Sequence, residues 1–265
     1  MAAVADRHAD AIRTAADAEI ARYLAAAQVA AGLGAQSDLS HGDFLAVTTP
    51  VVTDRLAGVT GIAYVVAADT AAVPSTQRYW RARGAVDLVL RPEQTTDRHY
   101  FAVLARSLTA VALRALGRDL AASSEAAAAL EEARRTGTVT ASRTYVLLSD
   151  RALPVEAQQR SFVVAAPVRA AASTPRSGQF LGWVMLGLRG GTFMTSVLRR
   201  ASAGQVNVAL ADDSDPRSPV PVAQVRTGTP LDRPDLQRHA HLSVAHRSWQ
   251  LTVTPTRALV AGDAQ

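Results

Sequence analysis

The fold is decided by residues 116–148, which read LGRDLAASSEAAAALEEARRTGTVTASRTYVLL. Ser123 and Ser124 are favourable N-cap residues, and Glu125 places an acid in the first turn of a helix. Alanine and leucine, both strong helix formers, dominate residues 126–133. Gly137 follows two arginines and suits the left-handed position after a helix end. This part of the stretch therefore predicts a short, well-capped helix.

A strand and an acidic loop are expected on either side of that helix. Residues 138–148 are rich in β-branched and aromatic side chains, which predicts a strand returning along the helix. The loop before the helix carries Asp119. Loop, helix and strand together form a unit that can close over a small ligand, although Asp119 could equally cap the turn that follows it.

Composition limits the function classes. The 265 residues suffice for one large domain or two small ones, and the absence of cysteine excludes disulfides and thiolate metal sites. All 28 basic residues are arginine, a bias typical of a GC-rich, bacterial genome. The net charge of +5 is scattered, with adjacent pairs only at Arg134-Arg135 and Arg199-Arg200. A scattered charge argues against a nucleic-acid partner.

The chain lacks the signs of a membrane span or of a signal peptide. No uncharged run reaches the roughly 18 residues that a span needs, and the longest covers residues 23–37. Residues 1–10 carry four charged or titratable side chains, without an apolar segment behind a basic start. The sequence as printed is therefore expected to be soluble.

Catalytic and metal-binding patterns are weak. His239, His241 and His246 form the only histidine cluster, but no ligand of suitable spacing completes a zinc site. The acidic run 212–215 is followed by Pro216 where a calcium loop should continue. The chain has no nucleophile elbow, phosphate loop or convincing carboxylate pair. We expect no enzyme activity, no metal and no cofactor.

The remaining sequence predicts a mixture of helices and antiparallel strands. Residues 2–33 favour one long helix with a thin, alanine-rich apolar stripe, which suits a partner helix as well as its own domain. Ser40 and Asp43 are spaced as a capping box for a helix that Pro50 should kink or leave at an exposed turn. Later helices are expected from Pro74 to Gly84 and over 192–200. Strands are expected over 59–66, 99–108, 161–169, 178–189, 205–212, 220–225, 241–249 and 249–255.

Several of these segments, in the same order, resemble the CHASE domain, an extracellular sensory module of bacterial and plant receptor kinases and nucleotide cyclases. The stretch LGRDL followed by ALEEARRTGTVTAS is the most specific part of the resemblance. Phe44, the strand pair SFVVAAPVR and GQFLGWVMLGLR, and the closing strand beginning at Trp249 extend it to about Pro255. Departures occur at Ala57, Ala102, Ala105, Ser107 and Leu108.

The resemblance implies an α/β (α+β) fold with a long N-terminal helix and two tandem PAS-like modules with antiparallel sheets. Residues 1–40 would form a signalling and dimerisation helix, 41–189 a membrane-distal ligand-binding module, and 190–265 a membrane-proximal module. Flanking transmembrane helices would lie outside the printed sequence, and the domain would be periplasmic or extracellular. A homodimer through the N-terminal helix is expected.

The resemblance also implies a ligand site around Asp119, whose carboxylate would orient a purine-like or other small organic ligand. The matching strand positions predicted to line the pocket are Phe101, Val103, Thr140, Ser142, Val164, Ala166 and Gly182. An interaction module with a collapsed pocket, signalling through a partner protein, is the alternative; a free-standing enzyme is the third hypothesis. A cavity of a few hundred Å³ beside Asp119 would favour the ligand over the partner.

Overall fold

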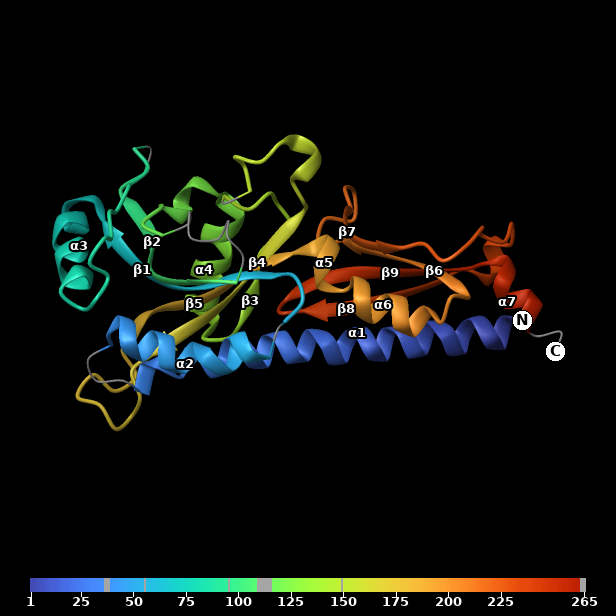
Figure 1. The fold of residues 1–265 in the computed structure, drawn as a ribbon, viewed down its shortest axis with the longest axis horizontal. Helices are drawn as coiled ribbons and strands as arrows, with labels where there is room; N and C mark the ends of the chain where they lie inside the picture. Colours follow the sequence, from blue (N-terminus) through green and yellow to red (C-terminus); the bar gives the residue numbers. More distant parts are fainter. Residues whose placement is uncertain (36–38, 55, 95, 109–115, 149, 263–265) are drawn as a thin grey trace.

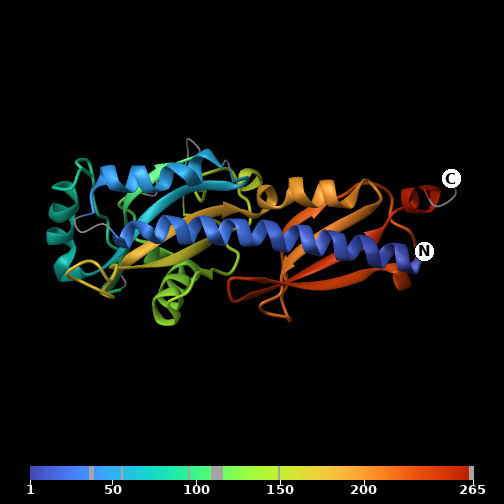
Figure 2. The same cartoon turned by 90° about the horizontal axis from the view of Figure 1, so that it is seen from below.

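The computed structural model describes residues 1–35, 39–54, 56–94, 96–108, 116–148 and 150–262. One long helix, α1 (Ala2–Ala31), runs along the length of an elongated molecule built on two antiparallel sheets (Figure 1). Figure 2, seen from below, shows the helix crossing in front of both sheets, with its N-terminus beside the second. This is the α+β architecture that the sequence predicts, and the predicted long helix is confirmed.

The apolar stripe of α1 packs on its own domain. Ile12, Ala16, Ile20 and Tyr23 are buried there, and Tyr23 meets the ring of Phe193 edge-to-face at 4.8 Å. The small alanines of the stripe let the helix lie close to the strands beneath it. Of the two partners predicted for this stripe, a second helix or the helix's own domain, its buried residues contact the domain.

The first sheet has the strand order β2-β1-β5-β4-β3, with every pair antiparallel. Its strands are β1 (Val59–Asp69), β2 (Arg98–Ser107), β3 (Thr140–Ala141), β4 (Ser161–Arg169) and β5 (Phe180–Arg189). Pairing between residues far apart in the sequence places β1 and β5 side by side inside the sheet. Helices cover both faces of the sheet. One face carries α1 and α2 (His41–Thr53), and the other carries α4 (Ser124–Thr136) (Figure 1).

Local capping explains where these helices begin and end. The Ser40 hydroxyl accepts from the Asp43 N–H at 3.2 Å, while the Asp43 carboxylate accepts from the Ser40 N–H at 2.9 Å, which confirms the capping box. These bonds also lower the pKa of Asp43. Pro50 sits exposed inside α2. Gly137 ends α4 with φ 72°, the left-handed conformation that favours glycine.

The second sheet has the order β7-β6-β9-β8 and is also antiparallel. Its strands are β6 (Val206–Asp212), β7 (Val220–Val225), β8 (Arg238–Val244) and β9 (Arg247–Pro255). Three further helices belong to this half: α5 (Gly190–Phe193), α6 (Thr195–Ser202) and α7 (Arg257–Gly262). Alternate residues of β6 and β9 are buried, as the alternating sequence predicts.

Three predicted elements differ in the structure. The strand expected over 241–249 is divided at Ala245 and His246, which form the turn between β8 and β9. The remaining small helix of the first half, α3, covers Val73–Arg81. The helix expected over 192–200 is interrupted at Met194. The strand expected over 138–148 shrinks to the two residues of β3.

The short β3 has a local cause. The Ser142 hydroxyl accepts from the Val163 N–H at 3.0 Å and so takes part in the ladder where the chain leaves the edge. Beyond it, Tyr145 makes a single isolated bridge with Ser161, and Leu147 is buried on the α4 side. Burial of these side chains overrides their strand propensity.

Candidate functional site

The segment that begins at Leu116 is fixed to the first sheet through backbone bonds. The Gly117 N–H donates to the Ala102 oxygen at 2.9 Å, and the Gly117 oxygen accepts from the Arg91 N–H at 2.9 Å. Gly117 has φ 75°, and an added Cβ would lie 2.0 Å from the Val89 oxygen, so only glycine fits. This anchor sets the position of Asp119 two residues later.

The Asp119 carboxylate is buried and accepts four hydrogen bonds. Oδ1 accepts from the N–H groups of Tyr100 at 2.9 Å and Ala121 at 3.0 Å. Oδ2 accepts from the Glu93 N–H at 3.0 Å and lies 2.5 Å from Nδ1 of His99. Protein groups thus occupy the carboxylate, and its bond to Ala121 is the predicted turn cap. A contact between Asp119 and a ligand stays a prediction.

His99 is the partner that the sequence did not reveal. Its ring is fully buried at the start of β2 and stacks on Phe101 with centroids 5.5 Å apart. Nδ1 faces Asp119, and Nε2 lies 2.8 Å from the Thr70 hydroxyl. A lone histidine at the head of a predicted strand carries no spacing signal that links it to an acid 20 residues later. The pair joins β2 to the loop before α4.

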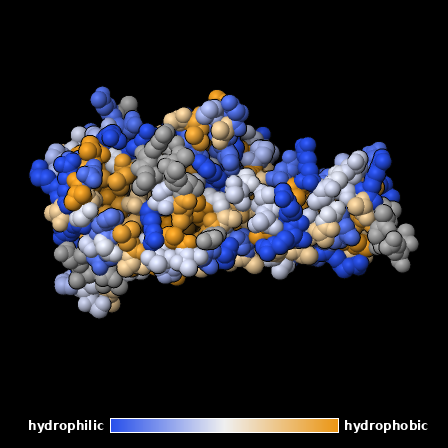
Figure 3. Space-filling view, viewed as in Figure 1, coloured by the Kyte–Doolittle hydropathy of each residue, from blue (hydrophilic) through white to orange (hydrophobic). Residues whose placement is uncertain are grey.

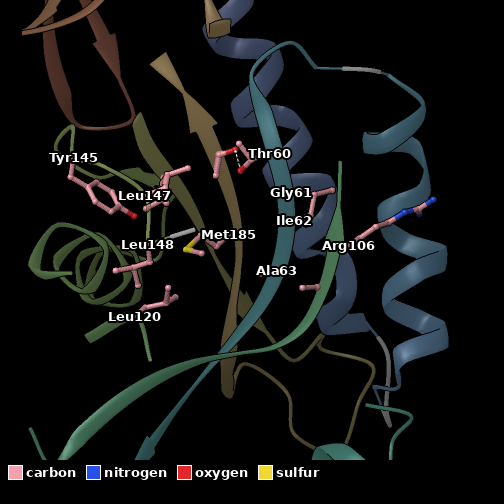
Figure 4. A pocket seen from close by; sticks show the side chains of 13 residues that line it. Thr60, Gly61, Ile62, Ala63, Arg106, Leu120, Tyr145, Leu147, Leu148 and Met185 are labelled. Atoms are coloured by element: carbon pink, nitrogen blue, oxygen red, sulfur yellow. Dashed lines mark hydrogen bonds between the residues drawn. The ribbon is translucent and has the colours of Figure 1, made fainter. Parts of the chain in front are cut away.

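An apolar cavity of about 60 Å³ lies between the first sheet and the loops beside α4 (Figure 4). It is lined by Thr60, Gly61, Ile62, Ala63, Ala105, Arg106, Leu120, Tyr145, Leu147, Leu148, Val163, Met185 and Gly187. Leu120 borders it, whereas Asp119 does not. Its volume is well below the roughly 300–1,000 Å³ of typical ligand sites.

The polar atoms around the cavity are already engaged. The Thr60 hydroxyl donates to the Gly187 oxygen at 3.1 Å. Figure 4 shows Arg106 reaching away from the cavity toward α2, where its guanidinium donates to the Thr49 hydroxyl at 3.0 Å. Burial raises the pKa of the Tyr145 phenol, which keeps it neutral. The cavity therefore offers apolar contacts and no buried charge.

The predicted lining residues are divided between two faces of the sheet. Phe101, Val103, Val164 and Ala166 belong to the core cluster shared with α1 and α2, on the face away from α4. Because side chains alternate along a strand, the cavity is reached from neighbouring positions such as Val163. The structure does not gather these four residues around the cavity.

The other three predicted residues lie elsewhere at the sheet. Thr140 and Ser142 are buried at the β3 edge without lining the cavity. Gly182 has φ 149°, and a Cβ there would lie 2.4 Å from the Val65 oxygen, so its role is close backbone approach. Of the eight predicted residues, Phe101 and Asp119 are neighbours through an isolated antiparallel bridge, and none of the eight lines the cavity. Their role in binding a ligand stays a prediction.

The chain just before the cavity loop contacts the turn between β8 and β9. The Ala141 N–H donates to the Ala245 oxygen at 3.1 Å, and Arg247 Nε donates to the Ala141 oxygen at 3.2 Å. The Thr138 hydroxyl lies 2.9 Å from His246 Nε2. The turn of the second sheet thus extends the free edge of the first.

A fourth bond lies closer to the cavity. The Thr144 N–H donates to Asp212 Oδ2 at 3.2 Å, and Asp212 is buried at the end of β6. Tyr145, the next residue, lines the cavity. One continuous segment, residues 138–148, therefore links the cavity wall to the second sheet.

The β8–β9 turn is strained in the absence of glycine. Ala245 and His246 have φ 45° and 72°, values that two-residue hairpins usually assign to Asn-Gly. We expect Ala245→Gly to raise the free energy of unfolding by about 0.5–1 kcal/mol, because relief of a left-handed alanine exceeds the entropy cost of glycine. Urea unfolding measures this change. Ala240→Gly, within β8, is the control and should destabilise; equal losses in both variants would contradict the strain.

Among the described residues, no group of three His, Asp or Glu side chains is placed to hold a metal ion. Of the three histidines that are close together in the sequence, His241 faces an acid, with its Nδ1 3.2 Å from Asp213 Oδ2. Within the part of the chain that the structure describes, no helix has both the length and the apolarity needed to cross a membrane.

Comparison with known proteins agrees with the fold and identifies the family. The periplasmic sensory domain of the Campylobacter jejuni chemoreceptor Tlp1 is similar in structure, with a TM-score of 0.52 and 13% identity over 98% of this chain and 95% of that one. A search of curated proteins gave no match. Residues 37–222 match the CHASE domain family, which confirms the resemblance noted in the sequence. The chain belongs to the CHASE domain family of extracellular sensing domains.

Proposed function

We propose that this domain senses a small molecule for a transmembrane receptor of the histidine kinase or diguanylate cyclase type. Residues 41–189 would form the membrane-distal binding module, and residues 190–265 the membrane-proximal one. The N-terminus of α1 and helix α7 lie at the same end of the molecule, beside the second sheet (Figures 1 and 2). A domain held between two membrane-spanning helices needs this arrangement.

The observation that carries the proposal is the continuity between cavity and second sheet. Residues 145–148 contribute to the cavity wall, and residues 138–144 bond to the β8–β9 turn and to Asp212. A ligand that favours one arrangement of this segment would shift the population of the whole domain by its difference in affinity. The segment gives such a shift a direct path to the end at which the chain would meet the membrane.

The ligand that suits this cavity is small, uncharged and apolar. A purine would bring several polar groups that the cavity does not match, and burying an unpaired polar group costs about 1–3 kcal/mol. The Asp119 carboxylate is saturated by its own chain. The role is sensing rather than catalysis, and the catalytic output would belong to another domain of the receptor.

A partner protein is the second candidate, favoured by the small volume of the cavity. On the face seen in Figure 3, hydrophobic residues gather mainly over the half of the molecule built on the first sheet. A homodimer through α1 is one such partner interaction. Val29 on α1 is 58% exposed beside a groove between α1 and α2, where a second copy of the chain could bind. In this version the partner, and not a ligand, would stabilise one state of the domain.

A thermal-shift screen separates the two candidates. Short-chain alcohols, ketones, esters and benzene form the apolar panel, and purines, amino acids and organic acids form the polar panel. We expect the apolar panel to raise the melting temperature, since a ligand at 100 times its dissociation constant adds about 2.7 kcal/mol. Ala105→Leu, which fills the cavity from β2, should abolish the shift.

The control for the screen is Ala211→Leu, a similar change on the second sheet. Ala211 is half-buried in β6 and does not line the cavity. A shift that survives Ala105→Leu would place the ligand elsewhere. No shift with any compound, together with stabilisation by a partner, would favour the interaction module.

A further inference from the structure

A hollow of about 710 Å³ opens on the second sheet, on the face away from α1 and α6. Val206 and Val208 of β6 are buried in the core shared with these helices, and side chains alternate along a strand. Asn207 and Ala209 therefore point the opposite way, and both line the hollow. Its volume falls within the roughly 300–1,000 Å³ range of small-molecule sites. No described residue lines both this hollow and the first cavity.

Strand register brings one polar wall of the hollow together. Asn207 of β6 lies directly opposite Thr254 of β9, and Ala209 lies opposite Gln224 of β7. Residues paired in this way project from the same face of a sheet, with Cβ atoms about 4.5–5.5 Å apart. Arg226 follows the end of β7, and all five residues line the hollow.

The loop after β7 forms the next wall, and its backbone is already fixed by the chain. Asn207 Oδ1 accepts from the N–H groups of Thr227 at 2.7 Å and Gly228 at 3.2 Å, and Nδ2 donates to the Gly228 oxygen at 2.9 Å. The Thr229 oxygen accepts from the Arg257 N–H at 3.1 Å. A loop held in this way has little conformational entropy to lose when a ligand binds.

The side chains around the hollow offer donors and no negative charge. Arg226 is exposed, and its guanidinium makes no hydrogen bond or ion pair with another described residue. Gln224 and Thr229 also have side-chain donors without a partner in the part of the chain that the structure describes. Thr254 Oγ1 accepts from Gln237 Nε2 at 3.1 Å, so its own proton is left to donate. Since none of the described lining residues is Asp or Glu, the hollow favours an anion.

We propose that this hollow binds a phosphate ester, with the phosphate held by Arg226. A phosphate group carries several acceptor oxygens, so it can accept from the guanidinium, the Gln224 amide and a threonine hydroxyl at the same time. A bare phosphate ion fills only a small part of the 710 Å³. Ala209 and Pro230 give the remaining space an apolar surface that suits the carbon skeleton of an ester.

The place of the hollow in the molecule gives this ester two sources. Thr229 bonds to Arg257, the first residue of α7, and α7 lies at the same end of the molecule as the N-terminus of α1 (Figure 1). In the receptor proposed above this end faces the membrane, where the headgroups of anionic phospholipids carry phosphate. A soluble phosphate ester presents the same group, and its binding does not depend on the proposed function.

The first test is calorimetric titration of the full chain with glycerol 3-phosphate. We expect saturable binding, a loss of at least tenfold in affinity in Arg226→Gln and partial recovery in Arg226→Lys, which keeps the charge without the planar donor pair. Ala209→Leu narrows the hollow without a change of charge and should also weaken binding. Arg200→Gln removes the same charge from an exposed position on α6, at the other face of the second sheet, and should bind like the parent.

Cosedimentation with vesicles identifies the source of the ester. The vesicles contain equal parts of phosphatidylglycerol and phosphatidylcholine, or phosphatidylcholine alone. Binding to the first kind only, lost in Arg226→Gln and kept in Arg200→Gln, supports the lipid headgroup. Saturable binding of glycerol 3-phosphate without vesicle binding supports a soluble ester.

Three results would overturn the proposal. They are binding of neither glycerol 3-phosphate at millimolar concentration nor the anionic vesicles, equal binding by Arg226→Gln and the parent, or an equal loss in Arg200→Gln. The last would show a response to net charge alone. Ala105→Leu, which fills the first cavity, should bind glycerol 3-phosphate like the parent, so this test and the apolar screen fail independently.

Discussion

Replacement of Asp119 by alanine is expected to lower the free energy of unfolding by about 3–5 kcal/mol. The change removes the acceptor for three backbone N–H groups and leaves His99 without its partner in a buried site. Buried donors without a partner cost about 1–3 kcal/mol each, and part of this cost is recovered by relaxation of the loop. Urea unfolding of the parent and the variant measures the difference.

Two variants place that result in context. Asp119→Asn keeps one acceptor oxygen and should lose less stability than alanine. Asp232→Ala removes an exposed carboxylate and should change stability by less than about 0.5 kcal/mol. An Asp119→Ala protein as stable as the parent, which no longer responds to ligand, would contradict the capping role and restore the ligand contact predicted from the sequence.

Removal of the Asp150 carboxylate is expected to have an effect of similar size. Asp150 is fully buried, and its oxygens accept hydrogen bonds from Nε and Nη2 of Arg189, each at 3.0 Å. This bond raises the pKa of the guanidinium and ties the end of the cavity loop to the end of β5. Breaking a buried pair by removing one partner costs about 3–5 kcal/mol, and we expect the lower end of that range here because the Arg189 side chain keeps 21% of its surface exposed.

An exposed ion pair of the same geometry is the control for this variant. Arg233 and Asp235 form the same two-bond geometry but are exposed. Asp235→Ala should leave the unfolding midpoint unchanged within error, because exposed pairs are screened by water. Equal effects of Asp150→Ala and Asp235→Ala would show that burial does not decide the strength of the pair.

The architecture follows from local signals in the sequence. The capping box at Ser40, the glycine at 137 and the alternating strands after residue 205 act within a few residues of themselves, so pattern and structure agree. Which face of the sheet a strand residue occupies is harder to predict from the sequence. Phe101 and Val164 lie on the face covered by α1 and α2, and a change of one position in register would move them to the face covered by α4.

The site depends on contacts between distant residues, which a single sequence does not display. His99 and Asp119 meet because two loops converge on β2, and nothing in their spacing indicates the pair. Residues 142–148 have strand propensity, yet they leave the sheet edge to cover the cavity. In both cases tertiary burial decides the outcome over local preference.

Amide hydrogen exchange, with and without the apolar compound that gives the largest thermal shift, shows whether a ligand in the cavity acts on the second sheet through residues 138–148, as we claim. We predict slower exchange over 138–148 and in the turn at 245–247, and no such change in Ala105→Leu. Protection that stays within the cavity wall, or appears only around α3, would contradict the claim.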